Sequence, residues 1–78
     1  NMPPLGSLSW LDFWEKKQRD KAEECAVIGC TGKAEVGGHV IKSGEGGRGY
    51  LLPMCYSCNN KPETEIFNVW EFDLASVR

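Results

Sequence analysis

The spacing of the four cysteines constrains the fold more than any other feature of this sequence. They form two close pairs, with four residues between Cys25 and Cys30 and two between Cys55 and Cys58. A structural zinc site takes four ligands in a tetrahedron, and two close pairs can supply them by closing a single loop. We therefore expect all four cysteines to bind one structural Zn²⁺.

His39 is a fifth candidate ligand. Either it replaces one cysteine as a zinc ligand, or it has a different role. Ligation by four cysteines leaves both pairs undistorted. Two disulfides, or four buried thiols without a metal, are the remaining alternatives.

The length of the chain gives a metal site a large role in stability. A chain of 78 residues has room for one small domain, whose core rarely supplies more than ~3–5 kcal/mol. A bound zinc contributes on the order of 10–16 kcal/mol in small finger peptides. We therefore expect the domain to unfold when the metal is removed.

The sequence points to the cytoplasm. Residues 1–7 show neither the basic nor the apolar segment of a signal peptide. No apolar run approaches the ~18–20 residues that span a bilayer, so we expect no membrane association. Under reducing intracellular conditions, close cysteines favour metal binding over disulfides.

The predicted fold is a small α+β domain stabilised by metal. We expect a disordered N-terminus over residues 1–6 and an amphipathic helix over 7–24, capped by Ser9 and packed on the domain. Residues 25–61 should form the zinc-binding core. Residues 62–78 should form a C-terminal strand extension.

Within the core, the glycine-rich middle of the chain predicts a β-hairpin after a zinc knuckle. Its strands should cover residues 34–42 and 50–54, followed by a short helix from Cys55 that Pro62 ends. In the C-terminal extension, residues 64–74 are rich in β-branched and aromatic types, which predicts one or two closing strands.

The first turns of the predicted helix carry an apolar face formed by Trp10, Leu11, Phe13 and Trp14. Such a face has to be buried. Either it covers the small core of this domain, or it is an interaction surface for a partner or a second copy.

Residues 25–61 carry an ordered set of motifs: CAVIGC, then GKAEVGGHVIKSGEGG, then YLLPMCYSCNNK. This order resembles the HNH family in its zinc-bearing treble-clef form. The resemblance implies a zinc knuckle, a β-hairpin and a short helix wrapped around one ion.

Many HNH domains are metal-dependent nucleases, so the resemblance also implies candidate catalytic residues. His39 matches the histidine that activates water as a general base, and Asn59 matches the helix position that helps to hold a catalytic Mg²⁺ or Mn²⁺. Arg48 and Lys61 are candidate phosphate contacts. The residue before the histidine is usually acidic in active members, whereas here it is Gly38.

Two main functions compete on this basis. The first is a non-catalytic binding or adaptor module, which contacts a protein partner or self-associates; pairing of residues 64–72 across a twofold axis is one route to a structural oligomer. The second is a small HNH-type endonuclease that uses His39. Nine basic against eleven acidic residues give a net charge of −2, whereas DNA-binding proteins are usually basic. DNA is therefore weakly supported as a partner, and the sequence favours the binding module.

Overall fold

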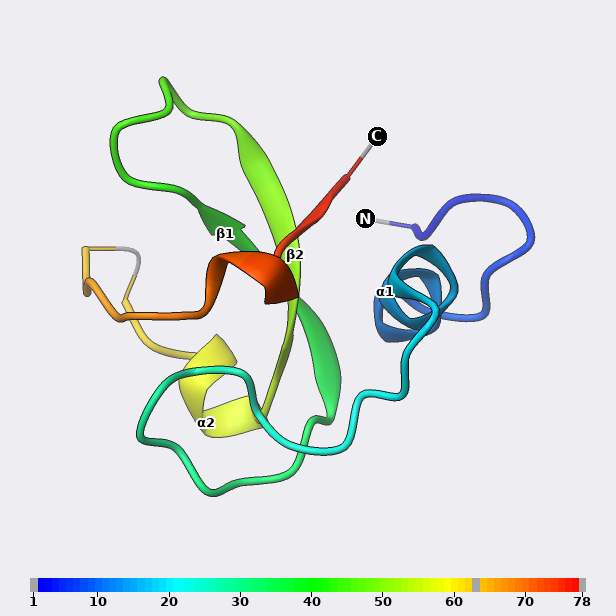
Figure 1. Cartoon of the computed structure of the whole chain (residues 1–78), viewed down its shortest axis with the longest axis horizontal. Helices are drawn as coiled ribbons and strands as arrows, with labels where there is room; N and C mark the ends of the chain where they lie inside the picture. Colours follow the sequence, from blue (N-terminus) through cyan, green and yellow to red (C-terminus); the bar gives the residue numbers. More distant parts are fainter. Residues whose placement is uncertain (1, 63, 78) are drawn as a thin grey trace.

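A three-stranded antiparallel sheet forms the centre of the molecule. Figure 1 shows the computed structural model, which describes residues 2–62 and 64–77. The strands are β1 (Val36–Ile41), β2 (Gly49–Met54) and β3 (Ala75–Ser76), in the order β1-β2-β3. The helix α1 (Trp10–Gln18) lies on one side of the sheet, and α2 (Tyr56–Asn59) lies on the other.

The β-hairpin predicted from the sequence is confirmed. β1 and β2 pair antiparallel, from Val36 opposite Met54 to Ile41 opposite Gly49. The predicted short helix before Pro62 is present as α2, whose N-cap is Cys55.

β2 has a buried residue on each face of the sheet. Leu51 and Leu52 are both fully buried, at 0% exposure, although neighbours in a strand point in opposite directions. Leu51 packs with Trp14 under α1, whereas Leu52 packs with Met54 and three of the cysteines. The sheet therefore separates two small cores, one beneath α1 and one around the cysteines.

α1 is shorter than the predicted helix over residues 7–24. It begins at Trp10, three residues after the predicted start, and Ser9 caps it as expected: the Ser9 hydroxyl accepts a hydrogen bond from the Asp12 N–H at 3.0 Å. It ends at Gln18, because Arg19 adopts a left-handed conformation (φ 55°) and closes the last turn. Residues 20–24 then run toward Cys25 outside any helix.

The aromatic face of α1 packs on the sheet of its own chain. Trp14 is only 3% exposed, and Trp10, Leu11 and Phe13 are half-buried. The packing is very close, because a Cβ added to Gly37 of β1 would lie 2.7 Å from the Trp10 carbonyl carbon. In the structure, the aromatic face therefore covers the core of its own domain, which is the first of the two alternatives.

The strands predicted over residues 64–74 are wrong. In the described part of this segment, Val69 forms an isolated bridge with Val27, and Glu71–Asp73 forms a 3₁₀ turn, η1. The closing strand is β3, which follows the predicted segment and pairs with β2.

Three side chains of α1 bind the C-terminal segment. Trp14 Nε1 donates to the Asp73 carbonyl at 2.8 Å, Lys17 Nζ to that of Ser76 at 2.7 Å, and Gln18 Nε2 to that of Phe72 at 3.0 Å. The first helix and the last strand are therefore linked directly.

The N-terminal residues form a turn before α1. Among residues 2–6, which the sequence assigns to a disordered N-terminus, the Pro4 carbonyl accepts a hydrogen bond from the Ser7 N–H at 3.1 Å. Residue 1 lies outside the described residues.

Candidate metal centre

Two tight local turns carry the four cysteines. In the first, the Cys30 N–H donates to the Val27 carbonyl at 3.0 Å, and Gly29 takes a positive φ of 92° that suits glycine. The second pair lies on α2, with Cys55 as the N-cap residue and Cys58 within the helix.

Gly32 lets the two turns approach each other. A Cβ at this position would lie 3.2 Å from Cys55 Cβ, which is tighter than an ordinary contact, and 3.6 Å from Cys30 Sγ. The contact of Gly32 with the second pair could not be predicted from the spacing of the cysteines.

The four sulfurs form a group that could hold a metal ion. The Sγ atoms of Cys25, Cys30, Cys55 and Cys58 all lie within 4.8 Å of one another, and those of Cys30 and Cys55 are 3.8 Å apart. Two sulfurs on a tetrahedral zinc, each ~2.3 Å from the ion, are about 3.8 Å apart. The donor set and its spacing therefore fit a four-sulfur zinc site.

Backbone N–H groups point at two of these sulfurs. Cys30 Sγ accepts from the Gly32 N–H, and Cys55 Sγ from the Cys58 N–H, both at 3.4 Å. The Cys58 N–H lowers the pKa of Cys55 to about 7, because it stabilises the thiolate. Such donors are what a negatively charged sulfur ligand needs.

Burial changes the pKa of two other thiols in the opposite direction. It raises the pKa of Cys58 to about 12, and it also raises the pKa of Cys25. Without a positive ion, four thiolates would repel one another at this spacing. A metal that binds here must displace protons, so its affinity rises with pH and falls in acid.

His39 and Asn59, the two candidate catalytic residues, lie on opposite faces of the sheet. The His39 ring makes an edge-to-face contact with Trp10 of α1, with ring centroids 4.7 Å apart. Asn59 is on α2, and its Oδ1 lies 2.9 Å from the position of a Cβ on Gly38. Because Gly38 and His39 are successive residues of β1, their side-chain directions are opposite.

The position of the acidic residue in active HNH nucleases is filled by other side chains. A Cβ on Gly38 would overlap Met54 Sδ and approach Asn59 Oδ1. Met54 is only 2% exposed. A carboxylate at residue 38 would therefore enter the core around the cysteines.

The two candidate phosphate contacts are also apart. Arg48 precedes β2, whereas Lys61 follows α2, beyond the other end of that strand. A strand of six residues spans about 20 Å at ~3.3 Å per residue. Lys61 Nζ also pairs with Glu65 Oε2 at 3.1 Å. The structure therefore brings the cysteines together but not the four residues of the nuclease hypothesis.

The sequence analysis missed an exposed aromatic pair in the C-terminal segment. Trp70 is 57% and Phe72 75% exposed, and their rings stack with centroids 6.1 Å apart and planes 9° from parallel. The available signal was two large aromatic residues two positions apart, which the sequence analysis assigned to a strand.

Comparison with known proteins adds no further assignment: no family model, no curated protein and no solved structure matches this chain. Among the described residues, no helix has the length and apolar character that crossing a membrane requires.

Proposed function

We propose that this chain is a zinc-stabilised module of HNH-like treble-clef form that binds a protein partner and does not cut DNA. The four cysteines would hold Zn²⁺ as a structural ion, in the reducing environment of the cytoplasm. The observation that carries the binding role is the stacked, exposed pair Trp70 and Phe72.

The placement of His39 supports a non-catalytic role. A general base and a metal ligand must reach the same phosphate, and here they lie on opposite sides of a sheet. His39 is exposed, but its ring lies against Trp10 of α1, and partial desolvation there lowers its pKa.

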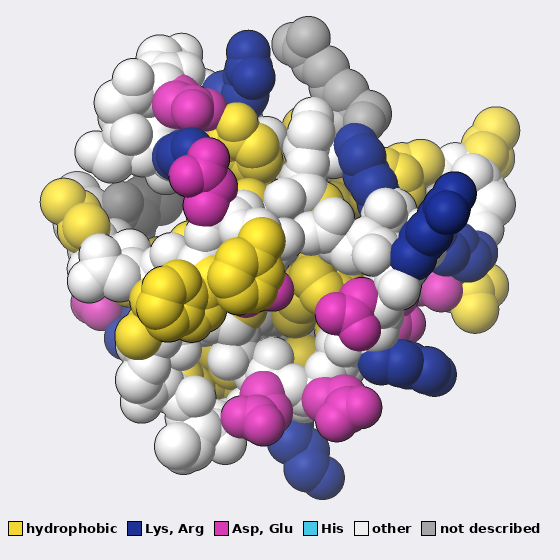
Figure 2. Space-filling view, viewed as in Figure 1, with side chains coloured by type: hydrophobic (Ala, Val, Ile, Leu, Met, Phe, Trp, Pro, Cys, Tyr) yellow, Lys and Arg dark blue, Asp and Glu magenta, His cyan; other side chains and the backbone are white. Residues whose placement is uncertain are grey.

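The exposed aromatic pair supports a binding role. Figure 2 shows hydrophobic side chains gathered on the face formed by η1, with both acidic and basic side chains around them. Large aromatic side chains are enriched where proteins bind one another, because they bury much apolar area at low cost in side-chain entropy. The net charge of −2 disfavours DNA as the partner, because affinity for DNA comes largely from lysine and arginine at phosphates.

A nicking assay separates this function from the endonuclease alternative. Zinc-loaded protein is incubated with supercoiled plasmid and either Mg²⁺ or Mn²⁺, beside His39→Ala protein with the same zinc content. We expect no nicking by either protein above a buffer control. Nicking by the wild type that disappears in His39→Ala would overturn the proposal.

A further inference from the structure

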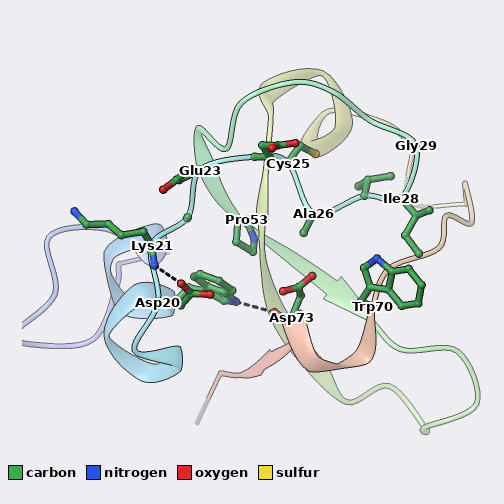
Figure 3. A pocket seen from close by; sticks show the side chains of 14 residues that line it. Asp20, Lys21, Glu23, Cys25, Ala26, Ile28, Gly29, Pro53, Trp70 and Asp73 are labelled. Carbon is green, nitrogen blue, oxygen red and sulfur yellow. Dashed lines mark hydrogen bonds between the residues drawn. The ribbon is translucent and has the colours of Figure 1, made fainter.

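A groove lies between the segment that leads into the first cysteine turn and the C-terminal segment. Its volume is about 490 Å³, within the ~300–1,000 Å³ of ligand clefts. Figure 3 shows Ile28 and Trp70 at one end, Asp20 and Glu23 at the other, and Asp73 between them. The groove is therefore aromatic at one end and acidic at the other.

The charges of this groove are unbalanced. Its lining has one basic residue, Lys21, against the four acidic residues Asp20, Glu23, Glu24 and Asp73. Within the described part of the chain, the carboxylates of Glu23, Glu24 and Asp73 make no hydrogen bond or ion pair. Burial raises the pKa of Asp73, and the charge of Asp20 adds to this effect. A cation bound in the groove would stabilise the charged form of Asp73 against both its burial and its repulsion by Asp20.

The aromatic end suits the same kind of ligand. Trp70 lines the groove, and stacking on Phe72 holds the plane of its ring. A tryptophan face attracts a lysine or arginine head group, and the long apolar stem of such a side chain can pack on Ile28. A cationic side chain docked beside Trp70 would also face Asp73, which lies between the two ends of the groove.

We propose that this groove docks a lysine- or arginine-bearing segment of the protein partner, with the cationic head group between Trp70 and the acidic residues. The inference rests on the proposed binding function and names the chemistry of its partner. A second copy of this chain is disfavoured by charge, because each copy carries a net charge of −2 before the thiolates are counted.

The test is a titration of zinc-loaded, ¹⁵N-labelled protein followed by NMR. The probe is a short peptide of alternating glycine and lysine whose two termini are blocked and uncharged. The matched control is the same peptide with every lysine side chain acetylated. We expect saturable shifts of the Trp70 indole N–H and of the amides of residues 20–29 with the first peptide, weakened by added salt. The acetylated peptide should cause no such shifts.

Matched variants locate the binding site. Trp70→Ala should weaken peptide binding by about threefold or more, and the double variant Glu23→Gln/Asp73→Asn should weaken it similarly by removing two charges. Ile66→Ala and Glu65→Gln remove an exposed apolar side chain and a charge outside the groove, and both should bind as the wild type does. Trp70→Leu keeps apolar bulk without the aromatic face, so it replaces Trp70→Ala if that variant does not fold.

Three results would overturn the inference. Equal binding of the acetylated peptide would show that charge is not recognised, and shifts that map outside the groove would place the site elsewhere. Self-association that disappears in Trp70→Ala, measured by analytical ultracentrifugation, would make a second copy the occupant. None of these results involves DNA cleavage, so failure of the inference remains distinct from failure of the proposed function.

Discussion

Two adjacent glycines in β1 decide how close the layers of this domain come. A side chain on Gly37 would meet the backbone of α1 at 2.7–2.8 Å, whereas one on Gly38 would meet Met54 and Asn59. The absence of a side chain at Gly37 therefore lets α1 pack closely on one face of β1, and its absence at Gly38 lets Met54 and α2 pack closely on the other. Gly37 is the less replaceable of the two, because helix backbone cannot move aside as the end of a methionine side chain can.

Replacement of Gly37 by alanine should destabilise the fold through this contact. We expect Gly37→Ala to lower the free energy of unfolding by about 1–3 kcal/mol, because α1 must shift away from the sheet. Thermal denaturation of zinc-loaded protein measures the change. Gly49→Ala is the matched control, since a Cβ there has only Val77 at 4.0 Å. Equal stability of the two variants would contradict the packing described for α1.

The cysteines were the part of the candidate site that could be predicted residue by residue. Their spacing along the chain limits how far apart two sulfurs of a pair can lie, and a structural zinc needs four ligands, so all four could be assigned to one cluster. The face to which His39 points could not be predicted, because a shift of one residue in strand register reverses it. Nor does spacing reveal that Met54 fills the space next to Gly38.

The positions of the helices and strands follow the buried apolar residues more closely than they follow intrinsic secondary-structure propensity. α1 stops at Gln18, soon after its last buried residue, although the charged residues that follow would suit a helix in isolation. Residues 64–74 have strong strand propensity, but an isolated bridge at Val69 and the turn η1 are all the described regular structure there. The hairpin was predictable because its two apolar runs flank a turn-rich loop, whereas the elements at either end depend on distant contacts.

Substitution of Trp14 should test how much the contact between α1 and the C-terminal segment contributes to stability. We expect Trp14→Ala to lower the free energy of unfolding by about 3–5 kcal/mol, because it empties a buried site and removes the hydrogen bond to the Asp73 carbonyl. Trp14→Phe should cost less, since it keeps part of the buried area. Denaturant unfolding of zinc-loaded variants measures both.

An exposed tryptophan serves as the control for this prediction. Trp70→Ala should change the free energy of unfolding by less than about 1 kcal/mol, as surface substitutions usually do. If Trp14→Ala instead keeps full stability and loses partner binding, the aromatic face of α1 is an interaction surface and not part of the core.

At the scale of the whole molecule, the interior is small and divided by the sheet. The largest fully buried side chains, among the residues described, are Leu51 and Leu52. One side of the sheet is completed by α1, and the other by the cysteine cluster. The apolar residues of the second side pack around the four sulfurs, and without an ion these thiols would lie in the middle of that cluster. We therefore expect the stability of the whole domain to depend on the metal.

Removal of the metal should therefore unfold the chain. We expect elemental analysis to find one zinc per chain, and a strong chelator at neutral pH to abolish the dispersion of amide signals in NMR spectra, with recovery on addition of Zn²⁺. Cys58→Ser should fail to retain zinc, whereas Ser57→Ala, a change at the exposed neighbour on α2, should retain it. Native mass spectrometry that finds a compact chain without metal, or one with disulfides, would contradict this prediction.

The hydrogen bonds between α1 and residues 72–76 give the molecule a defined response to mechanical load. A force that pulls the two chain ends apart would act first on these contacts and on the short pairing of β3 with β2. The cysteine turns lie between these contacts along the chain, so they would carry no tension until the contacts had broken. The ends of the fold thus shield the metal centre from pulling.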